Sequence, residues 1–357
     1  MSTKKRIFFA LIAAAVFFAG LEISLHLIHF HYQRSLSYME FGYPNRAELH
    51  QVFELDPGLL FRMRPGYDFG PGFGPLNRQG FRGADFQKQK PEGMPRIACL
   101  GDSVTFGTRE GAYPEMLGQA LKLIRAGHAF QVYNFGVPGY SSWQGKRLLK
   151  EVIDQYHPDL VVIFYGWNDL WLARGFSDDE QSPKPESPIT KLRDQLAILR
   201  TYQLLNKAAA SAQLKAKKKQ ADKFRVSVDK YQSNIDEMVR MAQASGARAV
   251  VATRPAGFGL APLPDFFEYL GFTRDDKYLE GIHDRYNQAA RRAAQDNGAA
   301  LLDLDLIFRE RGVKNLFDKP DKDIIHPNRA GLELIAESAA KVIISSIEPR
   351  VEKEGQE

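Results

Sequence analysis

The chain has a single cysteine, Cys99, among its 357 residues. An internal disulfide and a metal site built on clustered cysteines are therefore both excluded. The glycine-rich stretch 70–75 follows no strand-like run and lacks the Gly-Lys-Ser/Thr ending of a phosphate loop. His, Cys and Asp residues show no zinc-binding spacing. We therefore expect an activity that needs no metal and no other cofactor, and we expect Cys99 to pack as a small hydrophobe in a buried strand.

The excess of positive charge is also small. The formal net charge is +5, and the basic residues are not interleaved with aromatic residues as they are in nucleic-acid-binding folds. Apolar residues make up 44% of the chain and charged residues 25%, which is typical of a globular protein. No nucleic-acid partner is expected. The length fits one α/β domain with appendages as well as it fits two domains.

The N-terminus carries three cations at positions 4–6 followed by an apolar run over residues 7–21. Glu22 then separates this run from a second, mixed run over residues 23–30. This order predicts a secretory signal or a membrane anchor. A buried amphipathic helix would not need the flanking cations.

The small-x-small pattern required for cleavage is poor, so we favour an uncleaved, single-pass anchor over residues 1–30. The first run alone is shorter than the about 20 residues of a spanning helix. A span over residues 7–28 has the length but brings Glu22 and His26 into or near the bilayer. The remainder of the chain is then expected on the periplasmic or extracellular side of the cytoplasmic membrane.

Residues 31–94 are rich in Gly, Pro and aromatic residues and show no helical periodicity. Such punctuation indicates turns and short strands. We interpret the segment as a small N-terminal module that packs on the main domain. Arg82, in a Gly-Phe-Arg-Gly element of this segment, is expected to have a structural role, and a place near the active site is the alternative.

From residue 95 onward, strand-length apolar runs alternate with helix-length segments. The runs are β-branched and nearly continuous in their apolar character, as expected of parallel strands that are buried on both faces. The five runs cover residues 97–100, 130–135, 160–165, 247–253 and 300–304. They predict a three-layer α/β/α sandwich with a five-stranded parallel sheet over residues 95–347.

Two insertions, at about residues 171–225 and 255–281, interrupt this scheme. Each follows the carboxyl end of a predicted strand, which is the position of a lid or a pocket wall. The first insertion carries a lysine-rich run over residues 215–219, which we interpret as a solvated helix face.

Four sequence blocks carry chemistry at the same predicted edge of the sheet. They are Gly101-Asp102-Ser103, the glycine of Asn134-Phe135-Gly136, Gly166-Trp167-Asn168-Asp169, and Asp323-Ile324-Ile325-His326-Pro327. In open α/β folds, ligands bind outside the carboxyl ends of the strands. A serine alone could equally be a helix N-cap. Its combination with the other three blocks favours a nucleophile.

A serine nucleophile needs a neighbouring general base. Of the eight histidines, two stand three residues after an aspartate and just before a proline, namely His157 and His326. His157 directly precedes a predicted strand and so lies at the amino edge, where a turn or capping role is expected. His326 follows the last strand by a long loop and lies on the carboxyl side, so we predict it as the base. His283 is expected to open a helix and to be a structural residue.

Asp323 is predicted to hold the second nitrogen of the His326 ring and so to fix its tautomer. Asp318 and Asp321 are the alternatives for this role. A solvated loop is the preferred interpretation for both.

The four blocks, in this order, resemble the SGNH (GDSL-type) hydrolase family over about residues 95–345. The resemblance implies a flavodoxin-like sandwich and a triad of Ser103, Asp323 and His326. It further implies an oxyanion hole made of the Ser103 N–H, the Gly136 N–H and the Asn168 side-chain amide. Asp102 and Asp169 mostly support loops in this family. Its members cleave esters of lipids, acetylated sugars and aryl alcohols, as well as thioesters.

Three functions remain open at this point. The first is a serine esterase, an O-deacetylase among the options, that cleaves an ester of a lipid or carbohydrate through an acyl-enzyme on Ser103. The second is an O-acyltransferase of cell-envelope polysaccharide that uses the same triad. The third is a non-catalytic binding protein, since fold alone does not establish function.

Overall fold

The computed structural model describes residues 2–30, 52–125, 128–173, 177–181, 188, 192, 195–196, 198–217, 223–265, 267 and 275–347. Residues 31–51 of the predicted N-terminal module lie outside the described residues, as do the end of the lysine-rich run and parts of both insertions.

A five-stranded parallel sheet forms the centre of the molecule, as predicted. Its strands are β3 (Arg96–Gly101), β4 (Gln131–Gly136), β5 (Leu160–Phe164), β6 (Arg248–Ala252) and β7 (Ala300–Leu302). They are ordered β4-β3-β5-β6-β7, with every neighbouring pair parallel. Every residue of β3 and β5 is buried, which explains why these strands appear in the sequence as continuous apolar runs.

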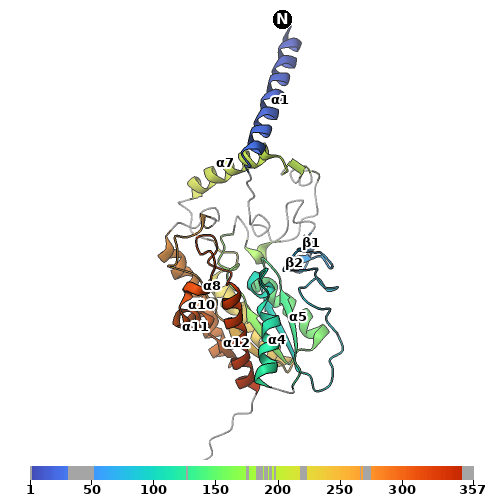
Figure 1. The fold of residues 1–357 in the computed structure, drawn as a ribbon, viewed down its shortest axis with the longest axis vertical. Coiled ribbons are helices and arrows are strands. Elements are labelled where there is room, and N and C mark those ends of the chain that lie inside the picture. Colours follow the sequence, from blue (N-terminus) through green and yellow to red (C-terminus); the bar gives the residue numbers. More distant parts are fainter. Residues whose placement is uncertain are drawn as a thin grey trace, which may run out of the picture.

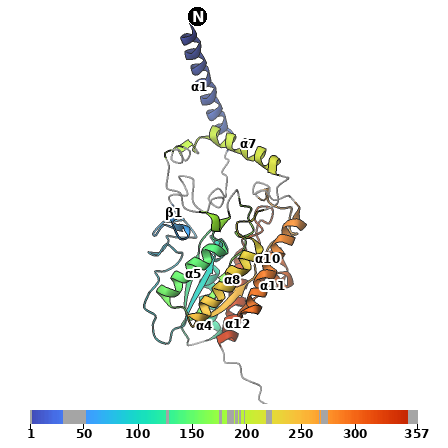
Figure 2. The ribbon, with the colours of Figure 1, turned by 180° about the vertical axis from the view of Figure 1, so that it is seen from behind.

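Helices cover both faces of the sheet (Figures 1 and 2). One face carries α4 (Tyr113–Ile124) and α12 (Arg329–Ile347), which contact each other. On the other face α8 (Val228–Ala244) packs between α5 (Ser142–Tyr156) and α10 (Asp276–Asp296). A short helix α11 (Leu304–Arg311) follows β7. The three-layer α/β/α sandwich predicted from the sequence is thus confirmed.

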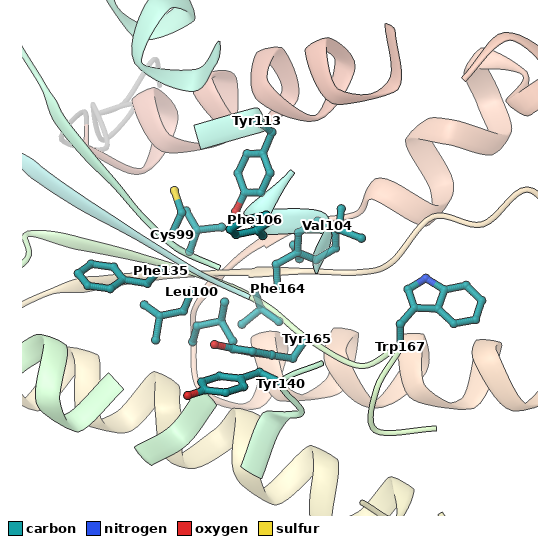
Figure 3. Close-up of a cluster of buried hydrophobic side chains, with 14 of the residues drawn as sticks. Cys99, Leu100, Val104, Phe106, Tyr113, Phe135, Tyr140, Phe164, Tyr165 and Trp167 are labelled. Atoms are coloured by element: carbon teal, nitrogen blue, oxygen red, sulfur yellow. The ribbon is translucent and has the colours of Figure 1, made fainter. Parts of the chain in front are cut away.

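The core is densely aromatic where the strands end (Figure 3). Cys99 and Leu100 on β3 lie beside Phe135 on β4 and Phe164 on β5, with tyrosines above and below the sheet. The Cys99 side chain is fully buried, and this burial raises the pKa of its thiol to about 12. The thiol therefore stays protonated, and the prediction that Cys99 serves packing is confirmed.

One helix begins earlier than the sequence suggested. His283 was predicted to open a helix, but α10 begins at Asp276, with the Asp275 carboxylate accepting hydrogen bonds from two N–H groups of its first turn. The predicted insertion 255–281 therefore ends inside α10. His283 is fully buried in the middle of this helix and packs 4.7 Å from the Trp167 ring, between ring centroids. It is structural, and burial holds its pKa well below its ordinary value.

The described part of the N-terminal module is built on an antiparallel pair, β1 (Phe53–Asp56) and β2 (Leu60–Met63). Its apolar side chains join the core of the sandwich. Tyr140 Oη donates to Phe61 O at 2.6 Å, and Arg82 Nη1 donates to Thr108 O at 2.8 Å. Arg82 is buried and binds backbone carbonyls, so its structural role is confirmed.

A single long helix, α1 (Thr3–Leu27), extends from the body of the molecule. Among the described residues it is the one helix long and apolar enough to cross a membrane, a test that a signal sequence would also pass. Its base meets α7 (Arg200–Lys217), which belongs to the first insertion and runs crosswise to α1 (Figures 1 and 2).

Candidate active site

Ser103 lies at the carboxyl edge of the sheet, immediately beyond the central strand β3. The strand ends at Gly101, and the short helix α3 (Ser103–Phe106) begins two residues later. Asp102 caps this helix by accepting a hydrogen bond from Val104 N at 2.9 Å. A Cβ atom on Gly101 would lie 1.9 Å from Thr105 Oγ1, so the tight turn that presents Ser103 requires glycine. The serine is half-buried and accessible.

A hydrogen-bonded chain links Ser103 to the loop before α12. His326 Nε2 lies 2.7 Å from Ser103 Oγ, and His326 Nδ1 lies 2.7 Å from Asp323 Oδ2. The other carboxylate oxygen of Asp323 accepts hydrogen bonds from the backbone N–H groups of Ile325 and His326, at 2.8 and 3.0 Å. The backbone of the 323–326 loop therefore turns about the Asp323 carboxylate and is held by it. Because Asp323 is fixed by its own loop, it holds the imidazole in a defined orientation.

The second insertion supports this loop from outside. Gly257 N donates to Ile324 O at 2.9 Å. A Cβ atom on Gly257 would approach the Phe317 ring to 3.3 Å and the Ile324 Cα to 3.5 Å. The segment after β6 thus lies directly against the loop that carries His326.

The ionisation of the three groups is coupled. Burial opposes the imidazolium of His326, but the Asp323 hydrogen bond and the charges of Asp323 and Asp102 together raise the pKa of His326 above its ordinary value. Burial would raise the pKa of Asp323, yet the hydrogen bonds and charge of His326 hold it below the ordinary value. Burial raises the pKa of Asp102 to about 6, against the Val104 N–H and the charges of His326 and Arg254.

The other Asp-x-x-His-Pro segment lies at the opposite edge of the sheet. His157 is the residue after the last turn of α5, with φ 47° and ψ 60°, and its N–H donates to Ile153 O at 3.2 Å. Both Asp154 and His157 are exposed. The predicted capping role of His157 is confirmed.

The predicted oxyanion donors are arranged differently from the expectation. The Gly136 N–H is already donated to Asn134 Oδ1 at 2.9 Å, in a buried position. A Cβ atom on Gly136 would lie 2.2 Å from Phe106 N, so this glycine allows α3 to pack on β4. The prediction of Gly136 as an oxyanion donor is therefore not supported, because the side chain of Asn134 uses its N–H.

Asn168 lies near the carboxyl end of β5 with its amide orientation fixed. Its Oδ1 accepts from Trp171 Nε1 at 3.1 Å. Its Nδ2 donates to Tyr140 O at 3.0 Å and to Asp102 Oδ2 at 3.3 Å. A hydrogen bond thus links the Asn168 amide to Asp102, the residue next to Ser103. Sequence reasoning missed the contributions of Trp171 and Tyr140, for which no motif provides a signal.

A buried arginine packs against the start of the Gly166-Trp167-Asn168-Asp169 segment. Sequence reasoning also missed this residue. Arg254 follows β6 and donates to the carbonyl oxygen of Tyr165 and, at 2.6 Å, to Tyr231 Oη. Gly166 has a φ of 137°, and a Cβ atom there would lie 2.3 Å from Arg254 Cζ. The glycine of Gly166-Trp167-Asn168-Asp169 is therefore required by the guanidinium beneath it. Asp169 accepts hydrogen bonds from Ser142 N and so supports the start of α5, as expected.

Among the described residues, no group of three or more His, Cys, Asp and Glu side chains could hold a metal ion. The arrangement around Ser103 offers a hydroxyl, a base in contact with it, and a carboxylate behind the base. This is the geometry of a serine nucleophile that is activated by proton transfer.

Comparison with known proteins gives matches at three levels. An arylesterase of Vibrio mimicus is 34% identical over 84 residues, which are 23% of this chain and 40% of the arylesterase. The match thus spans less than half of that relative's length. The solved lipase/acylhydrolase of Enterococcus faecalis superposes with a TM-score of 0.45 at 17% identity, over 72% of this chain and 99% of the other. An alpha/beta hydrolase from the metagenome of Lake Arreo gives a TM-score of 0.45 at 18% identity, with 70% and 94% covered.

The match that covers most of the chain by sequence is to a family. The sequence pattern of the GDSL-like Lipase/Acylhydrolase family matches residues 99–334. This range begins within β3, just before Ser103, and continues past His326 into α12. The chain therefore belongs to the GDSL-like lipase/acylhydrolase family.

Proposed function

We propose that this protein is a serine esterase that cleaves its substrate through an acyl-enzyme on Ser103. The observation that carries the proposal is the continuous chain from Ser103 Oγ through His326 to Asp323, with both links at 2.7 Å. A serine hydroxyl is a weak nucleophile unless a base takes its proton as it attacks. His326 is in contact to do so, and Asp323 stabilises the imidazolium that forms.

The reaction proceeds in two halves. Ser103 Oγ attacks the ester carbonyl while His326 Nε2 takes the hydroxyl proton and then passes it to the leaving alcohol. A water molecule, deprotonated by the same nitrogen, then attacks the acyl-enzyme and releases the acid. His326 thereby acts first as base and then as acid in each half, and Asp323 stays ionised throughout.

The negative charge on the substrate oxygen needs donors at the carboxyl edge. We assign this role to the Ser103 N–H and to Asn168 Nδ2, which would give up its longer hydrogen bond, the one to Asp102. In place of Gly136, the donor from the loop after β4 is the N–H of Gly139. This glycine has φ 86° in the turn closed by Tyr140 N and Val137 O at 3.1 Å. Removing one such donor typically lowers kcat by about 10² to 10³.

The substrate class and the location are proposed from the rest of the chain. We propose an ester of a lipid or carbohydrate, O-acetyl groups included, as the substrate. Both insertions lie at the carboxyl ends of strands, where they would form the walls of the binding site. We further propose that α1 spans the cytoplasmic membrane through residues 7–28 and leaves the sandwich on the periplasmic or extracellular side, since the cations at positions 4–6 precede the apolar run.

Hydrolysis of p-nitrophenyl acetate by the full chain in detergent tests the activity. We expect turnover in the wild type, labelling of Ser103 by a fluorophosphonate, and the loss of both in Ser103→Ala. Ser345→Ala is the matched control, because Ser345 is an exposed serine on α12 and should change neither readout. Turnover that survives in Ser103→Ala, or folded wild type that shows none, contradicts the proposal.

A further inference from the structure

The single acidic residue of α1 has a partner far away in the sequence. The Glu22 carboxylate accepts hydrogen bonds from Arg200 N and Thr201 N, both at 2.8 Å, and from Thr201 Oγ1 at 2.7 Å. These N–H groups belong to the first turn of α7, which has no partner for them within the helix. Glu22 therefore caps α7, and the charge that interrupts the apolar run joins α1 to a second helix.

The helix that Glu22 caps exposes apolar side chains. Ile198, just before α7, is 70% exposed, and Leu205 on its second turn is 60% exposed. Leu199, the residue before α7, is 44% exposed. Exposed apolar side chains thus lie both on α7 and directly before it. Figures 1 and 2 show α7 beyond one end of the sandwich, across the base of α1, and α12 running away from that end.

The charge of α7 has one sign. Its 18 residues include Arg200, Lys207, Lys215 and Lys217 and contain neither Asp nor Glu. Lys207 Nζ lies 5.6 Å from the ring centroid of Phe30, just after the end of α1. A helix that combines exposed leucine with cations only, and that follows an exposed isoleucine, has the composition of helices that lie in the headgroup region of a bilayer. Each cation close to an anionic surface strengthens the attraction to it.

We propose that α7 is an interfacial helix that lies on the surface of an anionic lipid bilayer at the point where α1 enters it. The inference rests on the proposed membrane anchoring of α1. Glu22 then lies near the outer boundary of the apolar layer, where α7 satisfies its carboxylate. These hydrogen bonds set the angle between the spanning helix and the surface helix. The end of the sandwich from which the insertions extend faces the lipid, which favours esters carried by the membrane over soluble esters.

Depth-dependent quenching of a fluorophore tests this arrangement in the full chain. Single cysteines at Leu205 on α7, Ala14 on α1 and Leu123 on α4 carry an NBD probe, since native Cys99 is buried and stays unlabelled. The protein is reconstituted into phosphatidylethanolamine/phosphatidylglycerol vesicles with or without brominated acyl chains. Leu123 is the matched control, because it is an exposed leucine (84%) on the sandwich.

We expect brominated lipid to quench the probes at Leu205→Cys and Ala14→Cys at least twofold and to leave the probe at Leu123→Cys unchanged. Quenching at Ala14 without quenching at Leu205 overturns the inference while the membrane anchor stands. Loss of quenching at both positions overturns the anchor as well. A blue-shifted but unquenched probe at Leu205 indicates a protein partner, a second copy of this chain included, and also overturns the inference.

The charge of the lipid partner is tested separately. When phosphatidylcholine replaces phosphatidylglycerol, we expect quenching at Leu205 to fall at least twofold and quenching at Ala14 to stay constant. Equal quenching of Leu205 in both lipids contradicts the anionic partner. Ile198→Cys provides a second exposed position, just before α7, and hydrolysis of p-nitrophenyl acetate confirms that each labelled variant is folded.

Discussion

Two segments of this chain share the pattern Asp-x-x-His-Pro, and they lie at opposite edges of one sheet. In the first, His157 ends α5 in a left-handed conformation, and both it and Asp154 are exposed. In the second, His326 lies between Asp323 and Ser103, within hydrogen-bonding distance of both. The two histidines share the same pattern of neighbours in sequence, so this pattern alone does not determine which of them lies next to a serine.

The difference comes from the element on the C-terminal side of each proline. Pro158 precedes β5 by two residues, so its histidine is placed where parallel strands begin. Pro327 precedes α12 and follows the last strand, β7, through α11 and a loop, so its histidine is placed where strands end. Ligands of such sheets bind at the ends of the strands, and Ser103 lies there as well. The same substitution made in each segment therefore tests whether activity depends on the edge of the sheet at which the histidine lies or on the Asp-x-x-His-Pro sequence itself.

The largest expected difference is between His326→Ala and His157→Ala. Loss of the base in contact with Ser103 should lower kcat for p-nitrophenyl acetate by about 10⁴- to 10⁶-fold, as expected for a residue that acts as a unit with the nucleophile. His157→Ala removes an exposed ring and should leave kcat/KM within about twofold, since surface substitutions have small effects. Comparable losses in the two variants would contradict the assignment of the base.

The second pair is Asp323→Asn and Asp154→Asn. An amide at position 323 can still accept the backbone N–H groups of its loop, but it no longer fixes the His326 tautomer or stabilises the imidazolium. We expect kcat to fall by about 10³- to 10⁴-fold. The larger loss is the one expected when the orienting aspartate is fully buried. Asp154→Asn should have no measurable effect on steady-state kinetics. An active Asp323→Asn enzyme would move the orienting role to another carboxylate, Asp318 or Asp321.

The third prediction concerns the pH dependence of kcat/KM. In the proposed mechanism His326 acts as a base only when it is neutral, and its pKa is raised by Asp323 and Asp102 against the effect of burial. Activity should therefore fall about tenfold per pH unit below a midpoint that lies above the ordinary pKa of histidine, about 6.5. Asp102→Asn removes one of the two charges that favour the imidazolium, so the midpoint should move to lower pH. The profile of His157→Ala should coincide with that of the wild type.

The sequence predicted the sheet because its strands are buried on both faces and therefore read as continuous apolar runs. It predicted the contact between Ser103 and His326 because the edge at which each segment lies depends only on the order of strands and helices. The start of α10 was placed too late, since residues 276–281 lie in a segment interpreted as an insertion. The hydrogen bond from Gly136 N to Asn134 and the capping of α7 by Glu22 could not be predicted. Both depend on where one side chain points, which no local pattern records.

The smallest expected effect concerns the stability of the protein when His157, at the end of α5, is replaced. His157 has a φ of 47°, a conformation that costs an ordinary L-residue about 1 kcal/mol and that glycine adopts freely. Glycine also gains entropy in the unfolded chain, which offsets part of this benefit. We expect His157→Gly to raise the free energy of unfolding by about 0.5 kcal/mol, measured by urea denaturation with unchanged kcat. A destabilised His157→Gly would mean that the imidazole itself contributes to the end of α5, so that position 157 would require histidine even at the edge of the sheet remote from Ser103.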